Sequence, residues 1–190
     1  RLPSRPPRWS SEPLPAVAVS LYTSGSSGDP QRIDKRFDQL DAELATQASL
    51  WPLRGQLVVS QVSHQHIYGL LFSILRPLCE ASPFSAQPCR YPETLHTWLR
   101  CCKTEGRRIV LVSAPPALSR LPEALDWQPE RTALETIYSS GAPLSKGASD
   151  QVFERLGKPV HEIYGSSETG GIAWRVQQRG SAWTALPGVE

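Results

Sequence analysis

The sequence has little excess charge of either sign. Its 20 lysine and arginine residues stand against 18 aspartate and glutamate residues, which gives a formal net charge of +2. A nucleic-acid-binding protein normally concentrates a large basic excess on one face, and this composition does not provide one. Arginines do gather in residues 1–15, but they alternate with prolines, as in an extended linker. We therefore expect no nucleic-acid partner, and we interpret residues 1–15 as a lead-in to a folded domain over residues 16–190.

Metal-type cysteine pairs, long apolar runs and targeting signals are also lacking. The cysteines at 79, 89, 101 and 102 form no Cys-x-x-Cys pair and no zinc-type Cys/His set. No apolar run approaches the ~20 residues that a membrane-spanning helix needs, and no basic-then-apolar signal peptide opens the chain. These absences predict free thiols, a cytoplasmic location and no membrane partner.

Short apolar runs alternate with amphipathic stretches along the chain. The run 108–112 is apolar on both faces, as strands of a buried parallel sheet are, whereas residues 36–50 show the spacing of an amphipathic helix. This alternation predicts an α/β domain with a mostly parallel sheet flanked by helices, in which ligands bind beyond the carboxyl ends of the strands. The expected strands are 16–23, 56–62, 107–114, 133–140 and 160–165, and the expected helices are 36–50, 67–79, 94–104 and 145–156.

The segment 23–28, Thr-Ser-Gly-Ser-Ser-Gly, is the most informative part of the sequence. Its glycines let backbone N–H groups converge, and its hydroxyls add hydrogen-bond donors that suit a polyphosphate. The chain has neither the Gly-Lys-Ser/Thr ending of a Walker loop nor a Gly-x-Gly-x-x-Gly dinucleotide motif. On composition alone, a flexible Ser/Gly turn is an equal alternative. The position after an apolar strand and before Pro30 and basic residues favours a phosphate site.

Three segments in order resemble the adenylate-forming superfamily, which includes acyl-CoA synthetases, aryl-CoA ligases, peptide-synthetase adenylation domains and luciferase. Residues 23–31 resemble its phosphate loop, Thr-Ser-Gly-Ser/Thr-Ser/Thr-Gly-x-Pro-Lys, with Gln31 in place of the lysine. Residues 161–171 resemble its adenine and magnesium segment, Tyr-Gly-x-Thr-Glu. Residues 139–145 resemble a turn that follows the adenine and acyl cleft. The chain therefore looks like a portion of the large N-terminal domain of such an enzyme.

The resemblance implies roles for individual residues. Tyr164 would pack on adenine, and Glu168 would be the catalytic carboxylate that holds Mg²⁺. His66 and Gly69 match a His-x-x-Gly segment and would line the pocket for the acyl substrate. Each residue also has a purely structural alternative. Tyr164 could be a core aromatic, Glu168 an acid at a helix N-terminus, and His66 a hydrogen-bonded histidine at a strand–helix junction. The predicted nucleotide-binding residues are Thr23, Ser24, Gly25, Ser26, Ser27, Gly28, Gly141, Ala142, Pro143, Tyr164, Gly165 and Ser167.

The reaction that the resemblance implies has two halves. A carboxylate attacks the α-phosphate of ATP to give an acyl-adenylate and pyrophosphate, and the thiol of CoA or of a phosphopantetheinyl carrier protein then takes the acyl group. The first half requires held phosphates, a metal and placed backbone donors more than covalent chemistry from the protein. The family's ribose-binding aspartate, hinge and small C-terminal domain with a catalytic lysine have no counterpart before Glu190. We therefore expect a fragment of a longer chain that is inactive in adenylation by itself. Arg32 and Lys35 lie close enough in sequence to Gln31 to substitute for the missing phosphate-loop lysine.

The substrate class rests on other segments. Residues 62–78, 91–93 and 164–175 resemble a short AMP-ligase branch associated with bacterial aryl-polyene pigments of the xanthomonadin type. This similarity implies an aryl or hydroxybenzoate-like acid and a role in pigment biosynthesis. Residues 66–73 lack the Phe-Asp pair that anchors the ammonium group in amino-acid-activating relatives.

The sequence suggests two alternatives to an acid-activating enzyme. Gln31 favours a non-catalytic nucleotide- or acyl-binding module, a degenerate adenylating domain. A serine hydrolase that uses Ser26 or Ser167 with His66 is disfavoured, because neither serine lies in Gly-x-Ser-x-Gly and no acid partner is evident.

Overall fold

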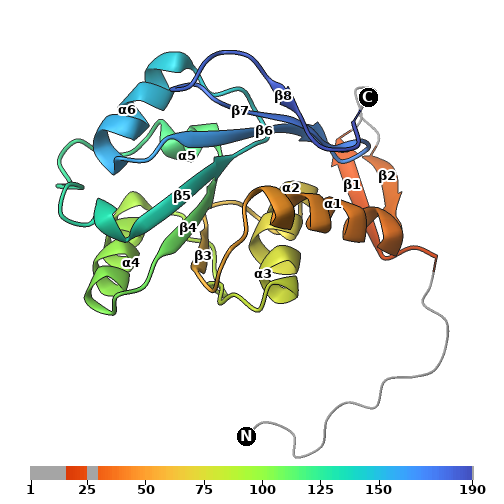
Figure 1. Ribbon diagram of the computed structural model, residues 1–190, viewed down its shortest axis with the longest axis horizontal. Helices are drawn as coiled ribbons and strands as arrows, with labels where there is room; N and C mark the ends of the chain where they lie inside the picture. Colours follow the sequence, from red (N-terminus) through yellow and green to blue (C-terminus); the bar gives the residue numbers. More distant parts are fainter. Residues whose placement is uncertain (1–15, 25–29, 190) are drawn as a thin grey trace, which may run out of the picture.

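The computed structural model in Figure 1 describes residues 16–24 and 30–189. Its strands form a two-stranded and a six-stranded sheet. The predicted lead-in and the loop residues Gly25, Ser26, Ser27 and Gly28 lie outside the described residues. In chain order the elements are β1 (Val19–Ser24), β2 (Pro30–Lys35), α1 (Phe37–Leu50), β3 (Leu57–Ser60), α2 (Ile67–Leu70), the π-helix η1 (Leu71–Leu75), α3 (Arg76–Cys79), α4 (Pro92–Thr104), β4 (Ile109–Ser113), α5 (Pro115–Leu118), the 3-10 helix η2 (Arg131–Ala133), β5 (Leu134–Ser139), α6 (Lys146–Leu156), β6 (Val160–Ser166), β7 (Gly170–Val176) and β8 (Thr184–Ala185).

The six-stranded sheet confirms the predicted α/β class with a mostly parallel sheet. Its strand order is β3-β4-β5-β6-β7-β8, with parallel pairing from β3 to β6 and antiparallel pairing from β6 to β8. Along β4, Ile109 and Leu111 pack with α4 and α6, whereas Val110 and Val112 pack with α1 and α2. Because side chains alternate along a strand, helices on both faces of the sheet explain its apolar run (Figure 1).

The strand predicted at 16–23 forms as β1, but it lies outside the main sheet. It pairs in antiparallel register with β2, beside the N-terminal part of α1 (Figure 1). Strand β2 was not expected from the sequence, because Pro30, Arg32 and Asp34 make its exposed positions polar or unable to donate a hydrogen bond. Strands β7 and β8 were not expected either, since β7 begins with two glycines and β8 has only 2 residues.

The predicted helix over 67–79 is helical throughout, but it is not regular. A π-helical stretch, η1, lies between α2 and α3. Pro77 follows this stretch, and in a regular α-helix its ring would collide with the carbonyl of Ser73 and leave that carbonyl without a partner. The wider turn of a π-helix immediately before the proline relieves this conflict.

Other expectations concern thiols, membranes and metals. All four cysteines are free thiols, as the sequence predicted. Within residues 16–24 and 30–189, no helix combines the length and the apolar character that crossing a membrane requires. The same residues contain no group of three or more His, Cys, Asp or Glu side chains arranged to hold a metal ion.

An aromatic cluster fills the core between the end of α1 and the main sheet. The ring of Trp51 lies 5.6 Å from that of Tyr138 and 5.5 Å from that of Trp174, measured between centroids. His161 stacks on Trp174 at 6.1 Å. Burial, together with the nearby charge of Arg179, lowers the pKa of His161 to about 4.

The low pKa of His161 predicts a loss of stability in acid. Between pH 6.5 and about 4 the unfolded chain binds a proton on His161 that the folded chain excludes, so falling pH favours unfolding. The full effect is roughly 3 kcal/mol, and above pH ~6.5 it vanishes. Urea unfolding across this range should show a shallower pH dependence for His161→Phe than for the wild type. The control is His64→Phe, which removes an exposed histidine outside this aromatic cluster. Equal slopes for the wild type and His161→Phe would contradict the prediction.

Candidate functional site

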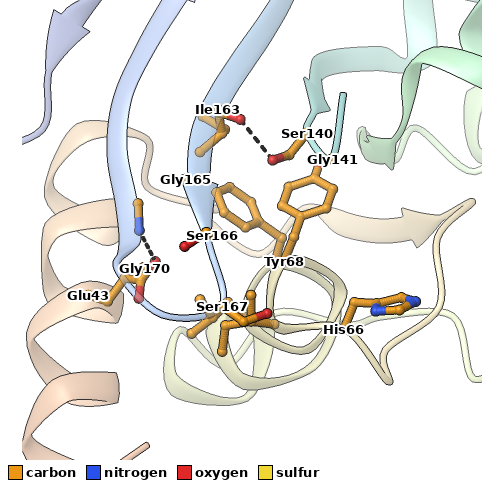
Figure 2. A pocket seen from close by; sticks show the side chains of 14 residues that line it. Glu43, His66, Tyr68, Ser140, Gly141, Ile163, Gly165, Ser166, Ser167 and Gly170 are labelled. Carbon is orange, nitrogen blue, oxygen red and sulfur yellow. Dashed lines mark hydrogen bonds between the residues drawn. The ribbon is translucent and has the colours of Figure 1, made fainter. Parts of the chain in front are cut away.

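A cavity of about 340 Å³ opens where β5 and β6 end (Figure 2). Three predicted segments meet at it: His66 at the start of α2, Gly141 after β5, and Gly165 and Ser167 around the end of β6. The carboxyl ends of adjacent parallel strands meet at one edge of the sheet, and open α/β sheets bind ligands there. The cavity therefore lies where the fold most readily supports a binding site.

The side of the cavity formed by α2 and η1 is apolar and aromatic. Ile67, Tyr68, Leu71 and Phe72 line it, and Ile163 of β6 faces it. The rings of Tyr68 and Phe72 lie 5.0 Å apart. Burial raises the pKa of Tyr68 well above its usual value, so its phenol is uncharged at neutral pH. A wall of this kind suits the ring or alkyl part of a ligand and not its charged group.

Gly69, which was predicted to bind substrate, packs against backbone instead of lining the cavity. A Cβ atom at Gly69 would lie 2.1 Å from the carbonyl oxygen of Ser63, so only glycine fits without a shift of the chain. His66 lies between these two residues, at the N-cap of α2. The His-x-x-Gly spacing therefore reflects a close approach that sets the position of His66 at the edge of the cavity.

The turn that contains Gly141, Ala142 and Pro143 is held at both ends. The hydroxyl of Ser140 donates to the carbonyl oxygen of Ile163 at 2.7 Å (Figure 2). The turn then leads into α6, whose N-cap Ser145 accepts a hydrogen bond from Ala148 N–H, as the expected turn before a helix requires. Gly141 lines the cavity together with Ser140, whereas Ala142 and Pro143 are not among its lining residues.

The β6–β7 hairpin carries the predicted Tyr-Gly-Ser-Ser-Glu segment. Gly165 lets its strands meet, because a Cβ there would lie 2.2 Å from the carbonyl oxygen of Gly170. The side chain of Tyr164 is 57% exposed, which rules out the alternative of a core aromatic. Glu168 lies in the turn between two strands, which rules out a helix N-terminus, and a hydrogen bond from Ser166 holds its pKa below the usual value. Its exposed carboxylate is therefore ionised at neutral pH and open to a cation.

Two residues outside the predicted site hold this turn in place. Lys35 of β2 is 5% exposed and donates from Nζ to the carbonyl oxygen of Glu168 at 2.9 Å. Glu43 of α1 accepts a hydrogen bond from Gly171 N–H at 3.0 Å (Figure 2), and burial raises the pKa of Glu43. Lys35, Glu43 and Glu168 line a second cavity of about 330 Å³, and Glu43 lines the first as well. Contacts from β2 and α1 thus fix the turn that carries Glu168.

The charge missing at Gln31 has one candidate replacement on the same face of β2. The guanidinium of Arg32 is paired with Asp34 at 2.8 Å on the exposed face. Side chains alternate along a strand, so Gln31 and Lys35 share the other face. Lys35 is the cation of β2 on that face, and it already contacts the carbonyl oxygen of Glu168. Thr23 and Ser24, the described part of the predicted phosphate loop, end β1 directly opposite the start of β2.

Glu43, Tyr68 and Phe72 were not predicted as site residues. Glu43 lies among the charged residues of an amphipathic helix, where an acid is ordinary. Tyr68 and Phe72 have the spacing of residues that face a core. The one signal in the sequence was their closeness to His66, whose segment was already expected to line a pocket.

Comparisons with known proteins identify the family. The family model for "AMP-binding enzyme" matches residues 4–190. The 4-coumarate–CoA ligase of Rhodobacter capsulatus is 30% identical over 177 residues, which cover 87% of this chain and 41% of the ligase. The propionate–CoA ligase of Salmonella typhimurium is 27% identical over 158 residues, which cover 79% of this chain and 25% of that ligase. The chain therefore spans less than half the length of these relatives.

Solved structures share the fold. Apo MatB from Rhodopseudomonas palustris superimposes with a TM-score of 0.81 at 20% identity, covering 95% of this chain and 36% of that one. The O-succinylbenzoate coenzyme A synthetase MenE from Bacillus subtilis, solved in complex with AMP, gives a TM-score of 0.74 at 21% identity over 90% of this chain and 36% of MenE. Both show the same arrangement of helices around a mostly parallel sheet.

The predicted motifs at 23–31, 139–145 and 161–171 all lie inside the family match. The resemblance to adenylate-forming enzymes is thus confirmed at the level of the family, while the narrower aryl-polyene branch stays a prediction. The chain belongs to the family of AMP-binding enzymes.

Proposed function

We propose that this chain forms the ATP-facing part of an enzyme that activates a carboxylic acid as its acyl-adenylate and passes the acyl group to CoA or to a carrier-protein thiol. The observation that carries the proposal is the meeting of two motif segments at one cavity. The turn after β5 and the end of β6 border the same space at the carboxyl ends of the sheet. The relatives named as CoA ligases support the reaction class.

The cavity and the segments beside it would divide the work of holding ATP. Tyr164 and Glu168 belong to the adjoining hairpin and are not among the residues that line the cavity. The exposed ring of Tyr164 and the turn 141–143 would contact the adenine, and the segment 23–28 would hold the phosphates. Glu168 fits a magnesium ligand, because it is an exposed carboxylate whose pKa lies below the usual value. When bound, Mg²⁺ neutralises charge on the phosphates. The protein's own part is to orient ATP, with Lys35 and Glu43 fixing the turn that carries Glu168.

The acid would occupy the apolar side of the cavity. The similar ligases are named for 4-coumarate, an aryl acid, and for propionate, an alkyl acid, so the names alone do not choose between them. The paired rings of Tyr68 and Phe72 favour a planar aryl group, such as a hydroxybenzoate-like acid of the aryl-polyene branch. His66 at the edge of the cavity would meet the polar end of that acid.

Calorimetric titration with ATP tests the nucleotide site. The wild-type chain should bind ATP saturably in the presence of Mg²⁺. Glu168→Ala should weaken this binding by about tenfold, because it removes the carboxylate that holds the metal, and should change magnesium-free binding little. Glu105→Ala, at an exposed acid of an unrelated loop, serves as the matched control. A wild-type chain that does not bind ATP would contradict the proposed function.

The chain alone should be unable to complete adenylation. It spans 41% of the coumarate ligase, and the proposed reaction also requires a ribose-binding aspartate and a catalytic lysine that the resemblance places after Glu190. A pyrophosphate-release assay with ATP, Mg²⁺ and a panel of aryl acids should therefore show no turnover above background. Turnover typical of a whole ligase would show that this expectation is wrong.

The second candidate, a non-catalytic module derived from an adenylating domain, is favoured by Gln31. The neighbouring Arg32 is already paired with Asp34, so the phosphate loop has no adjacent free arginine in the described part of β2. Such a module would bind an aryl acid without ATP. Calorimetry with the acid alone, and then with ATP added, separates this module from the ligase. The module should bind the acid and not ATP, whereas the ligase should bind ATP.

A further inference from the structure

We propose that Glu162, Arg175 and Trp183 form a brace that positions both adenine-facing segments of the site, the turn 141–143 and the ring of Tyr164. The inference rests on the proposed function, since it assigns a task within the nucleotide site. None of the three residues lines the cavity among the residues that the structure describes. They are therefore positioning residues and not ATP contacts.

Glu162 is the fixed centre of the brace. It is 3% exposed and lies opposite Arg175 in the pairing of β6 with β7. Arg175 donates to both carboxylate oxygens, from Nε to Oε1 at 2.9 Å and from Nη2 to Oε2 at 3.1 Å. Gln177 Nε2 donates to Oε1 at 2.6 Å. A bidentate arginine–carboxylate pair with a third donor has a single well-defined geometry, so these side chains form a rigid unit inside the sheet.

One connection runs from this unit to the turn 141–143. Leu144, the residue after Pro143, donates its backbone N–H to Glu162 Oε2 at 3.2 Å. Its carbonyl oxygen accepts a hydrogen bond from Gln177 Nε2 at 2.8 Å. The backbone N–H and carbonyl group of Leu144 are thus bound by Glu162 and Gln177, which are also hydrogen-bonded to each other. The turn keeps its place because this end cannot move without breaking buried hydrogen bonds.

The other connection runs from Arg175 to Tyr164 across Trp183. The guanidinium carbon of Arg175 lies 4.4 Å from the centroid of the Trp183 ring, within cation–π distance. The Trp183 ring in turn lies 5.7 Å from that of Tyr164, at an interplanar angle of 53°. Trp183 is 41% exposed and Tyr164 is 57% exposed, so each ring covers part of an otherwise open neighbour. Arg175 therefore fixes Trp183, and Trp183 restricts the rotamers of Tyr164.

Restricting Tyr164 matters because binding must otherwise order an exposed ring. A side chain that is already held in its bound orientation loses less conformational entropy when a ligand arrives. The benefit applies to the part of the ligand that meets Tyr164, which is the base. The phosphates would contact other residues, in the segment 23–28 and at Glu168. The brace therefore predicts an effect on ATP that is absent for a ligand without a base.

Calorimetry with two ligands and a double-mutant cycle tests the brace. Trp183→Ala should weaken binding of Mg·ATP about fivefold, whereas binding of inorganic tripolyphosphate with Mg²⁺ should not change. Trp183→Phe keeps a ring between Arg175 and Tyr164 and should restore most of the affinity for ATP. In a Tyr164→Ala background, Trp183→Ala should have no further effect. Phe153→Ala is the matched control, because Phe153 is a similarly exposed aromatic, 45% exposed, on α6.

The outcomes separate this inference from the proposed function. If Trp183→Ala binds ATP as tightly as the wild type does, while Tyr164→Ala binds ATP more weakly, the brace is overturned and the nucleotide site is retained. Equal weakening of ATP and tripolyphosphate overturns it as well, since a general structural defect would give that result. An undiminished effect of Trp183→Ala in the Tyr164→Ala background shows that Trp183 does not act through Tyr164. A wild-type chain that binds no ATP overturns both proposals together.

Discussion

Replacing Glu162 by alanine is expected to reduce the free energy of unfolding by about 3 kcal/mol. The substitution leaves the guanidinium of Arg175, whose side chain is only 17% exposed, without its carboxylate partner. It also removes the acceptors of Gln177 and of the Leu144 N–H. Removing one member of a buried ion pair is costly because the remaining charge and donors are not returned to water.

Chemical denaturation of Glu162→Ala and Glu123→Ala measures this effect against a matched ion pair. Glu123 pairs with Arg155 at 2.7 Å, but its side chain is 86% exposed. Exposed ion pairs contribute about 1 kcal/mol or less, so Glu123→Ala should change stability little. Similar losses for the two variants would show that the buried contacts of Glu162 with Arg175, Gln177 and Leu144 add no stability beyond that of an exposed ion pair.

Replacing Gly69 by alanine is expected to destabilise the fold by about 3 kcal/mol, near the upper end for overpacking a filled site. The added methyl group would lie 2.1 Å from the Ser63 carbonyl oxygen and 2.8 Å from its carbonyl carbon. Backbone atoms cannot rotate away as a side chain can. Either α2 or the preceding turn must move, and His66 would be displaced with it.

Gly147 provides a control for the Gly69 substitution. It also lies in a helix, α6, and a Cβ there meets nothing within 4 Å. Gly147→Ala should therefore raise stability by about 0.5 kcal/mol, since alanine has the higher helix propensity. Thermal unfolding of both variants should move the midpoint in opposite directions. Midpoints shifted equally for the two would contradict the close approach of α2 to Ser63.

The main elements of the fold could be predicted because they depend on local patterns. Within the run 108–112, residues 109–112 are all apolar, as a strand covered on both faces requires. The helix at 36–50 has one apolar stripe. The pairing partner of β1 could not be predicted, because β2 has few apolar residues and an exposed polar face. Strand β8 is too short to give any periodic signal. These strands form because neighbouring chain segments supply their hydrogen bonds.

The site was predictable from motifs only at the level of segments. The segments containing His66, Gly141 and Gly165 were expected from resemblance, and the fold brings them to one cavity. The supports were not predictable, because Lys35 meets Glu168 across 133 positions of sequence and Glu43 meets Gly171 across 128. A buried lysine or glutamate is recognised as a support only when its partner in space is known. Gly69 shows the converse, since its close approach to the Ser63 backbone already requires a glycine at this motif position.

Photochemical labelling with an ATP analogue that carries an azide on the adenine ring tests the nucleotide site most directly. After irradiation with Mg²⁺ and proteolysis, the label should be found on the peptide that contains Tyr164 or on the peptide that contains the turn 141–143, and excess ATP should abolish it. Labelling of these peptides would place the base between the two segments that meet beside the cavity. Labelling elsewhere in the chain, abolished equally well by ATP, would contradict the assignment of this cleft as the nucleotide site.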